Sequence, residues 1–414
     1  MAPKRRAQTA SKRKAEEEAP KAPKRAKAAA EEQPAEPLRP VEHPSHGKVP
    51  GTIFVFGDGS CGQLGLGEDV GEKLRPGAVA IPDGKKVLQV SSGGMHTVAL
   101  TEDGGVWSWG VNDEGALGRE TGGELWQKSQ LATGKPGDSY VPGEVAMPKD
   151  AARVVQLSAG DSHTAALTED GKVYTWGTFR SDTGVMGYSE STRIQLTPLL
   201  SLDLSSAKKS DRVVKISSGA DHILALTERH TVYTWGAGMC GQLGRLGVRL
   251  LDAAREGERS ALALQLRPAE VTVTRNTAKR KVVDVACGTY ASFMWTNDGK
   301  LYAWGLNNYG QLAHQSQVLW CPVLLTAFKE KPVAWVSPGQ HHTLVYTKDG
   351  NLMSMGRPTY GRLGRSDVEV GSDDPVPEPK PVEGLEGVAL AGASAGLAVS
   401  GAFAKGAEGL WRAW

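Results

Sequence analysis

The stretch VLQVSSGGMHTVALTEDGGVWSWGVNDEGALG, residues 87–118, decides the fold because the chain repeats it. Close copies are VVQLSAGDSHTAALTEDGKVYTWG, residues 154–177, and VVKISSGADHILALTERHTVYTWGAGMCGQLG, residues 213–244. Such self-similar units stack or are arranged radially, because one unit is too small to bury its own core. Weaker or partial copies occupy residues 282–313, 335–364 and 390–414, and a half copy, GTIFVFGDGSCGQLG, occupies residues 51–65.

Each unit has the pattern of short antiparallel strands. Apolar blocks rich in Val, Leu, Tyr and Trp are separated by glycine or Glu-Asp-Gly turns, which is typical of strands joined by hairpins. Four such strands repeated about seven times predict an all-β chain folded as a seven-bladed β-propeller. An open solenoid is the alternative. The 51 glycines in 414 residues fit a fold with many turns that need positive φ.

The half copy at residues 51–65 has no G-x-x-H turn of its own, and the last copy breaks off at Trp414. We therefore expect the closing blade to be incomplete in this chain, and further residues to follow Trp414 in the full-length protein. Unpaired strand edges would make such a fragment less stable.

Alternation of the strands sorts the loops onto two rims. The G-x-x-H turns and the loops after each Trp-Gly pair share one rim, called here the upper rim. The Glu-Asp-Gly turns and the segments that precede each first strand share the other, called here the lower rim. Residues that differ between copies on one rim are candidates for function, whereas residues that recur serve the unit itself.

The first 44 residues form a separate, disordered tail, and residues 45–414 form the propeller. Residues 1–30 carry a net charge of +7 within a chain of net charge +2, and they have almost no bulky apolar side chains. Clusters such as Lys4, Arg5 and Arg6 predict nuclear import through importin, contact with nucleic acid, or both. The alternative is a solvated linker. A nuclear, chromatin-associated protein is expected.

Several function classes are disfavoured by the sequence. The four cysteines, at 61, 240, 287 and 321, have no metal-binding spacing, so we expect no metal site, no cofactor and a reducing compartment. No nucleophile and base are paired as an enzyme would need. The longest uncharged stretch, residues 388–404, is mostly Ala, Gly and Ser, so no membrane span is expected.

The phrases GDSHTAALTEDG, GMHT…WSWG…NDEGALGR and GQHHT…GRPTYGRLG resemble the regulator of chromosome condensation family. The resemblance covers about residues 45 to 414. It implies a propeller that binds chromatin on one face and the small GTPase Ran on the other, and that promotes guanine-nucleotide exchange on Ran without covalent chemistry. The alternative is a chromatin-binding or scaffold propeller without exchange activity.

Comparison of the copies separates scaffold from candidate site in the G-x-x-H turn. The histidine recurs at four positions, which predicts a buried imidazole bonded to turn backbone. The two middle positions vary, so we expect their side chains to point out of the upper rim. Asp161, Asp221 and His341 are the ionisable residues there, and the resemblance implies that they act in exchange. The recurring histidines are His96, His163, His222 and His342.

The loop after Trp176-Gly177 is longer than its counterparts. It takes ten residues to its closing glycine, against eight in residues 237–244, and it carries Phe179, Arg180 and Asp182. We expect an elongated hairpin that probes a partner, and the resemblance implies a wedge pressed against Ran. Glu190 and Arg245 match Ran-contacting positions in the family. Ser60 departs from an acidic position of the family, for which Asp58 is a candidate substitute.

The lower rim carries basic residues ahead of the first strand in successive units, although the residues after the tail are net acidic. This asymmetry predicts a phosphate-facing surface; solvated lysines are the alternative. Residues 246–264, with three arginines, are a second candidate for DNA or the histone acidic patch, on a rim that the sequence leaves open. The foremost lower-rim candidates are Lys279, Arg280 and Lys281.

Overall fold

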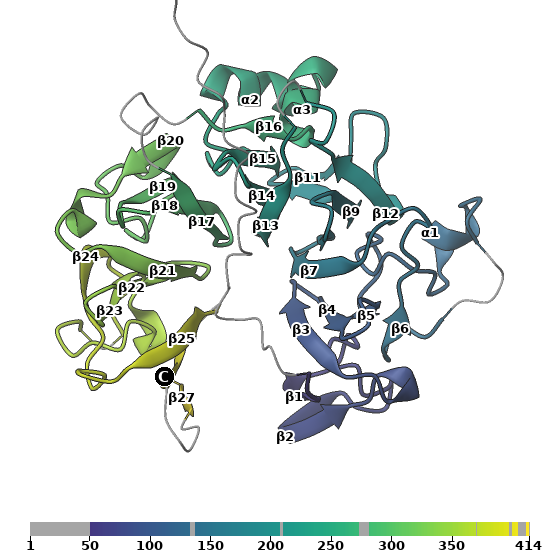
Figure 1. Ribbon diagram of the computed structural model, residues 1–414, viewed down its shortest axis with the longest axis horizontal. Helices are drawn as coiled ribbons and strands as arrows, with labels where there is room; N and C mark the ends of the chain where they lie inside the picture. Colours follow the sequence, from purple (N-terminus) through teal and green to yellow (C-terminus); the bar gives the residue numbers. More distant parts are fainter. Residues whose placement is uncertain are drawn as a thin grey trace, which may run out of the picture. The chain divides into compact units, whose positions relative to one another are not determined.

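The computed structural model describes residues 50–132, 137–207, 210–272, 281–369, 371–396, 400–404 and 411–413. The predicted boundary between residues 44 and 45 lies outside these residues, and so do Lys4, Arg5, Arg6, Lys279 and Arg280. Strands make up nearly all the regular structure (Figure 1).

Five antiparallel sheets of four strands follow one another along the chain. In each, the first three strands come from the repeated phrase, and the fourth lies at the outer edge. Blade 1 is β3 (Val87–Ser92), β4 (His96–Thr101), β5 (Val106–Gly110) and β6 (Gly143–Glu144); blade 2 is β7 (Val154–Ala159), β8 (His163–Thr168), β9 (Val173–Gly177) and β12 (Gln195–Leu202); blade 3 is β13 (Val213–Ser218), β14 (His222–Thr227), β15 (Val232–Gly236) and β16 (Ala269–Glu270). Blade 4 is β17 (Val282–Cys287), β18 (Ala291–Thr296), β19 (Leu301–Leu306) and β20 (Val318–Leu324); blade 5 is β21 (Val333–Pro338), β22 (His342–Thr347), β23 (Leu352–Gly356) and β24 (Val376–Pro381).

Two smaller sheets and a few inserted elements complete the described part. Blade 6 is β25 (Leu390–Ala395), β26 (Ser400–Ala404) and β27 (Trp411–Ala413), and a two-stranded sheet is formed by β1 (Ile53–Asp58) and β2 (Glu72–Val79). A hairpin is formed by β10 (Phe179–Ser181) and β11 (Gly184–Gly187). The helices are α1 (Glu124–Gln127), α2 (Val248–Arg255) and α3 (Arg259–Leu266), with 3-10 turns at Pro82–Gly84, Thr326–Phe328 and Thr359–Gly361.

The first strands of successive blades lie side by side around a common centre, from β3 through β7, β13, β17 and β21 to β25 (Figure 1). They surround a channel of about 420 Å³ whose wall is largely glycine and other small residues of the G-x-x-H turns. Seven radial sheets around a channel confirm the predicted β-propeller. Among the described residues, the two-stranded sheet of β1 and β2 matches the expectation of an incomplete closing blade.

A contact between a tryptophan of one blade and a glycine of the preceding blade explains why the Trp-Gly and Leu-Gly phrases recur. Trp176 is fully buried at the end of β9, and its indole N–H donates to the carbonyl of Ala116 in the preceding blade over 2.8 Å. Gly118 lies against that ring at φ +66°, where a Cβ would come within 2.7 Å of the indole nitrogen. Trp304 and Gly244 repeat this contact. Each unit therefore caps its neighbour, which couples the blades.

The recurring histidines are buried, as predicted, but three of them bond a neighbouring blade instead of turn backbone and so form a second link between blades. The imidazole of His96 bonds the hydroxyl of Thr164 in the next blade over 2.9 Å, not the backbone of its own turn. That hydroxyl donates its only proton to the carbonyl of Ala116, so the Nε2 of His96 must be the donor in the bond between them. His222 with Ser292, and His342 with Ser400, form the same bond over 2.9 and 2.8 Å.

A third link joins the first strands. The amide of Gln89 bonds both backbone groups of Leu157 in blade 2, and Gln156 does the same to Ile216 in blade 3. In blade 3 the corresponding residue is Lys215, whose ammonium pairs with Asp284 of blade 4 in a buried ion pair. An amide bridge is thus replaced by a charge pair at one junction.

Candidate functional site

The hairpin β10–β11 interrupts the upper rim between blades 2 and 3. Arg180 pairs with Val185 and Ser181 with Gly184, which leaves Asp182 and Thr183 in the turn. The expected elongated hairpin is therefore present. In blades 1 and 4 the second residue of this loop is an asparagine that organises a compact turn: Asn112 donates to the carbonyl of Arg119 and the hydroxyl of Thr121, and Asn307 donates to the carbonyls of His314 and Ser316. Phe179 occupies that position in the hairpin and cannot make these bonds.

Three contacts fix the root of the hairpin. The N–H of Thr178 donates to the carbonyl of Ser162 over 2.9 Å. The N–H of Arg180 donates to the carboxylate of Asp221 over 2.8 Å. Between these bonds, the ring of Phe179 lies 4.9 Å from the imidazole of His163, measured between ring centroids. The hairpin thus rests on the turns of blades 2 and 3 together.

Phe179 is buried, whereas the sequence-based expectation placed it where it could contact a partner. Its side chain is only 1% exposed and packs in the core of blades 2 and 3. An aromatic ring with this burial anchors the hairpin through its apolar area. The exposed residues of the hairpin are Arg180, Asp182 and Thr183.

The three ionisable turn residues do not share one environment. Asp161 is exposed, and it lines the central channel while its N–H donates to the carbonyl of Ala220 over 2.7 Å. Asp221 stands one position later in its turn and is 9% exposed, so the expectation that it points freely to solvent was wrong. Its carboxylate faces the hairpin, where it accepts the N–H of Arg180. His341 occupies the same position as Asp221 in blade 5 and is half-buried.

Burial makes Asp221 an unusual acid. Its pKa is raised to about 7, chiefly because the carboxyl is desolvated, and the negative charges of Asp161 and Glu114 add to this effect. The hydrogen bond from Arg180 opposes the shift. Although Asp161 is exposed, partial desolvation by the surrounding turns raises the pKa of its carboxyl as well, against the attraction of Arg180. The two acids therefore flank the same arginine.

Ion pairs brace the hairpin from the sides. Arg180 pairs with Glu114, and Arg255 at the end of α2 pairs with Asp182 over 2.8 Å. Just beyond the hairpin, Glu190 pairs with Arg267. The contact of Arg255 with the hairpin settles the rim of residues 246–264, which the sequence left open: α2 approaches the upper rim.

Arg245 is part of the scaffold. Its guanidinium donates to the carbonyls of Thr234 and Arg267, each over 3.1 Å, and burial lowers its pKa to about 10. Arg119 makes the equivalent bonds in blade 1. The expectation that Arg245 contacts a partner is therefore not supported by its geometry. Its recurrence after the Leu-Gly phrase, in GALGR, GQLGR and GRLGR, was the available signal.

His341 belongs to an aromatic and cationic cluster that sequence reasoning missed. Its imidazole lies 4.8 Å from the ring of Tyr309, between centroids, and Arg357 lies over the same ring at 4.8 Å. Burial first, and then Arg357 and Arg362, lower the pKa of His341, which keeps the imidazole neutral near pH 7. Tyr360, 76% exposed, completes the cluster at the rim.

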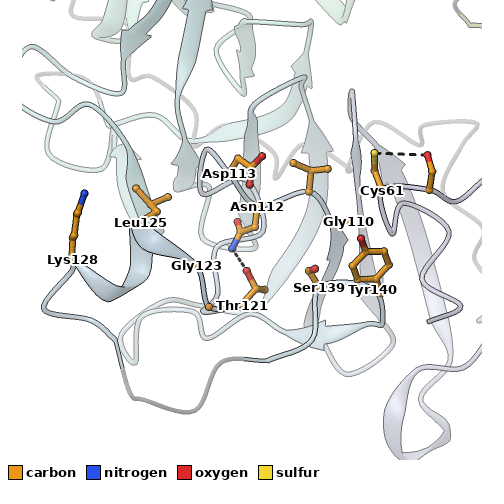
Figure 2. Close-up of a pocket in the computed structure, with 13 residues that line it drawn as sticks. Cys61, Gly110, Asn112, Asp113, Thr121, Gly123, Leu125, Lys128, Ser139 and Tyr140 are labelled. Carbon is orange, nitrogen blue, oxygen red and sulfur yellow. Dashed lines mark hydrogen bonds between the residues drawn. The ribbon is translucent and has the colours of Figure 1, made fainter. Parts of the chain in front are cut away.

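A cavity opens on the upper rim at blade 1. It measures about 660 Å³ and is lined by loops of blade 1 and of the β1–β2 sheet (Figure 2). Asp113 lines both this cavity and a smaller one of about 330 Å³ that reaches Asp161 and Arg180. Ser60 lines the large cavity, whereas the carboxylate of Asp58 accepts the N–H of Ser60 over 2.8 Å. Asp58 is thus already engaged by its own turn.

Several basic residues of the lower rim are bonded to other residues of the propeller. Lys85 pairs with Asp103 over 2.9 Å, and Arg212 pairs with Glu228 over 3.0 Å. Arg153 donates to the carbonyl of Glu102 in the preceding blade. The basic residues that remain exposed ahead of the first strands include Lys86, Lys149, Lys281 and Lys331.

Across the described ranges, no group of three or more His, Cys, Asp or Glu side chains could hold a metal ion. The four cysteines are free thiols. Within the same ranges, none of the helices has the length and apolar character needed to cross a bilayer.

Comparisons with known proteins agree with this architecture. The RCC1-like domain family matches residues 52–414. The regulator of chromosome condensation of Xenopus laevis is 39% identical over 87% of this chain and 79% of its own length. The guanine nucleotide exchange factor SRM1 of Saccharomyces cerevisiae is 34% identical over 74% of this chain and 65% of its own length.

Two solved structures of yeast Prp20 superpose on the propeller. Yeast RCC1 (Prp20) bound to Kap60 has a TM-score of 0.74 at 29% identity, covering 96% of this chain and 86% of that one. Prp20p, described with its binding properties to Gsp1p and histones, has a TM-score of 0.71 at 29% identity, covering 89% and 82%. Repeat, propeller and similarity along nearly the whole described chain agree, and the chain belongs to the regulator of chromosome condensation family.

Proposed function

We propose that this chain is a guanine-nucleotide exchange factor for a Ran-type small GTPase, and that it works on chromatin in the nucleus. The observation that carries the exchange activity is the β10–β11 hairpin, which projects from the upper rim and is held by Asp221 through the N–H of Arg180. The relatives named as exchange factors supply the class of reaction. No covalent step is involved.

The mechanism is differential binding. A GTPase holds its nucleotide through phosphate-loop amides, a lysine and Mg²⁺. A protein that binds the nucleotide-free form more tightly lowers nucleotide affinity by the same factor, because coupling between two ligands is reciprocal. The rigid root of the hairpin allows its tip, Asp182 and Thr183, to press on the loops that hold the phosphates. Asp161 supplies an accessible carboxylate for basic groups of the GTPase.

The chain itself offers a matched control. Replacement of residues 178–187 by AGMCGQLG, the eight-residue loop of blade 3, removes the hairpin while keeping a loop that this propeller already folds. We expect catalytic amounts of the unaltered chain to accelerate release of fluorescent GDP from Ran, and the loop-replaced variant to lose most of that acceleration. An equally active variant, with the thermal transition unchanged, would contradict the role of the hairpin.

Chromatin binding is assigned to the lower rim together with the basic tail. Exposed Lys86, Lys149, Lys281 and Lys331 would neutralise phosphates, and Prp20p is described as binding histones.

Import through importin fits the tail clusters around Lys4, Arg5 and Arg6, and yeast RCC1 was crystallised with Kap60. Binding of nucleosomes should weaken steeply as salt rises, because counterions are released from DNA. Substitution of the four lysines by glutamine should reduce both the affinity and the salt dependence while leaving GDP release unchanged.

A further inference from the structure

The junction between blades 2 and 3 lacks the histidine bond that links other blades. At the position of Thr164 and Ser292, which accept the imidazole N–H elsewhere, blade 3 has Ile223. Isoleucine has no hydroxyl, and both ring nitrogens of His163 are buried without a hydrogen-bond partner within the described residues. His163 is 1% exposed, so its imidazole is shielded from bulk solvent.

Leaving a buried imidazole unpartnered is costly, so its retention needs a reason. Three departures from the repeat coincide at this junction. The loop is lengthened into the hairpin, Phe179 stands where Asn112 and Asn307 organise the shorter loops, and Ile223 replaces the hydroxyl. All three meet at one side chain, because the ring of Phe179 lies on the imidazole of His163 at 4.9 Å and a tilt of 45°.

We propose that His163 is a positioning residue for the hairpin. Because Ile223 offers no hydroxyl, the imidazole of His163 does not link the blades; it packs against the ring of Phe179 and thereby holds β10–β11 in place. This inference rests on the proposed exchange function. Gly236 also packs closely against the Phe179 ring, since a Cβ there would come within 3.0 Å of it. Burial lowers the pKa of His163 to about 3, so its imidazole is a neutral ring at every physiological pH. Thr178 and Arg180 then fix the backbone on either side of the Phe179 ring.

The test exploits the contrast between His163 and His222, which occupy the same position in adjacent blades. His163→Leu removes the ring and two unpartnered nitrogens, so we expect an unchanged or raised Tm. The hairpin amides of residues 180–187 should exchange with solvent between about twofold and tenfold faster, the range expected for loss of one ring pair. His222→Leu breaks a formed bond to Ser292, so we expect a lowered Tm and unchanged hairpin amides.

Release of GDP from Ran supplies the functional readout. His163→Leu should lower kcat by a factor comparable to the loss of amide protection, because hairpin placement and not docking is impaired. His163→Phe restores a ring and should recover kcat and protection. His163→Leu combined with Phe179→Ala should be no worse than Phe179→Ala alone, since both remove the same contact.

The proposal is overturned if His163→Leu behaves as His222→Leu does, with a lower Tm and intact hairpin protection, or if His163→Phe fails to rescue. Amide exchange is measured without the GTPase. If the unaltered chain fails to release GDP, the proposed function is lost, while the amide data still decide whether His163 supports the hairpin.

Discussion

The carboxylate of Asp221 accepts the main-chain N–H of Arg180 over 2.8 Å, which ties the turn of blade 3 to the hairpin inserted in blade 2. This bond turns an acid expected to face a partner into an internal anchor. Asp161 is left as the accessible carboxylate beside the same arginine. The candidate site is therefore an ordered hairpin flanked by acids and not a row of free carboxylates.

The raised pKa of Asp221, about 7, predicts a pH-dependent cost of folding. Because the folded state favours the protonated acid, the contribution of Asp221 to stability falls as pH rises from about 4 to about 7, by up to about 4 kcal/mol, and is constant above that range. Asp221→Asn keeps an acceptor for Arg180 and removes the charge. We expect it to match the unaltered protein at pH 4 and to exceed its stability at pH 8 in urea unfolding.

Asp221→Ala is the control for that comparison, since it removes the acceptor as well. It should slow GDP release, whereas Asp221→Asn should retain most of it. Equal losses in both variants would show that the charge, and not the anchoring bond, carries the role of Asp221.

Arg245→Ala should lower stability and not selectively impair exchange. The guanidinium donates to the carbonyls of Thr234 and Arg267 in its own blade, and charge-assisted bonds of this kind contribute about 1.5–3 kcal/mol. Arg119→Ala, in the equivalent position of blade 1, should lower Tm by a similar amount. Activity per folded molecule distinguishes the outcomes: a large loss for Arg245→Ala, with Tm intact, would restore Arg245 as a partner contact.

Lys215→Ala should be strongly destabilising, because it leaves Asp284 buried without its counter-charge. Both residues are under 10% exposed, and removal of one partner of such a pair costs about 3–5 kcal/mol. Lys215→Met combined with Asp284→Leu should recover most of this loss, since the apolar pair needs no desolvation of charge. Urea unfolding of the single and double variants checks both statements.

Asp182 and Arg255 form an exposed ion pair, so either substitution by alanine should change stability by no more than about 1 kcal/mol. If the hairpin tip meets the GTPase, Asp182→Ala should nevertheless lower kcat/KM for GDP release. Arg255→Ala frees Asp182 without removing it and should retain activity. Parallel losses in the two variants would instead indicate that the pair acts as a brace.

The recurring histidines predict steep acid unfolding. Burial lowers the pKa of His96 and His342 to about 4, and that of His163 and His222 to about 3. Because the unfolded chain protonates near 6.5 and the folded chain does not, stability is lost as pH falls from about 6.5 through these values. At pH 5, these four residues together should bind about four protons on unfolding, which is measurable from the pH dependence of the unfolding free energy. His222→Leu should reduce that uptake by about one.

Much of the site was predictable by comparing the repeats with one another. The lengthened loop after Gly177 could be recognised because it departs from the repeat, and the structure has the predicted hairpin in that loop. Recurrence after Leu-Gly could have marked Arg245 as scaffold, because Arg119 and Arg365 stand in the same place. The cluster of Tyr309, His341 and Arg357 gave no such signal, because its members come from separate turns that only folding brings together.

The sequence by itself determined the propeller, the order of the strands within a repeated unit and the rim on which the recurring loops lie. These follow from period and turn chemistry, which are local properties of a repeated unit. Only the tertiary structure decided which side chains face solvent. Phe179 and Asp221 both look like surface residues in a list of turn positions, yet both are buried, because a loop from one blade folds over the turn of the next. Burial depends on what a neighbouring unit places above a residue, and no pattern within one unit records that.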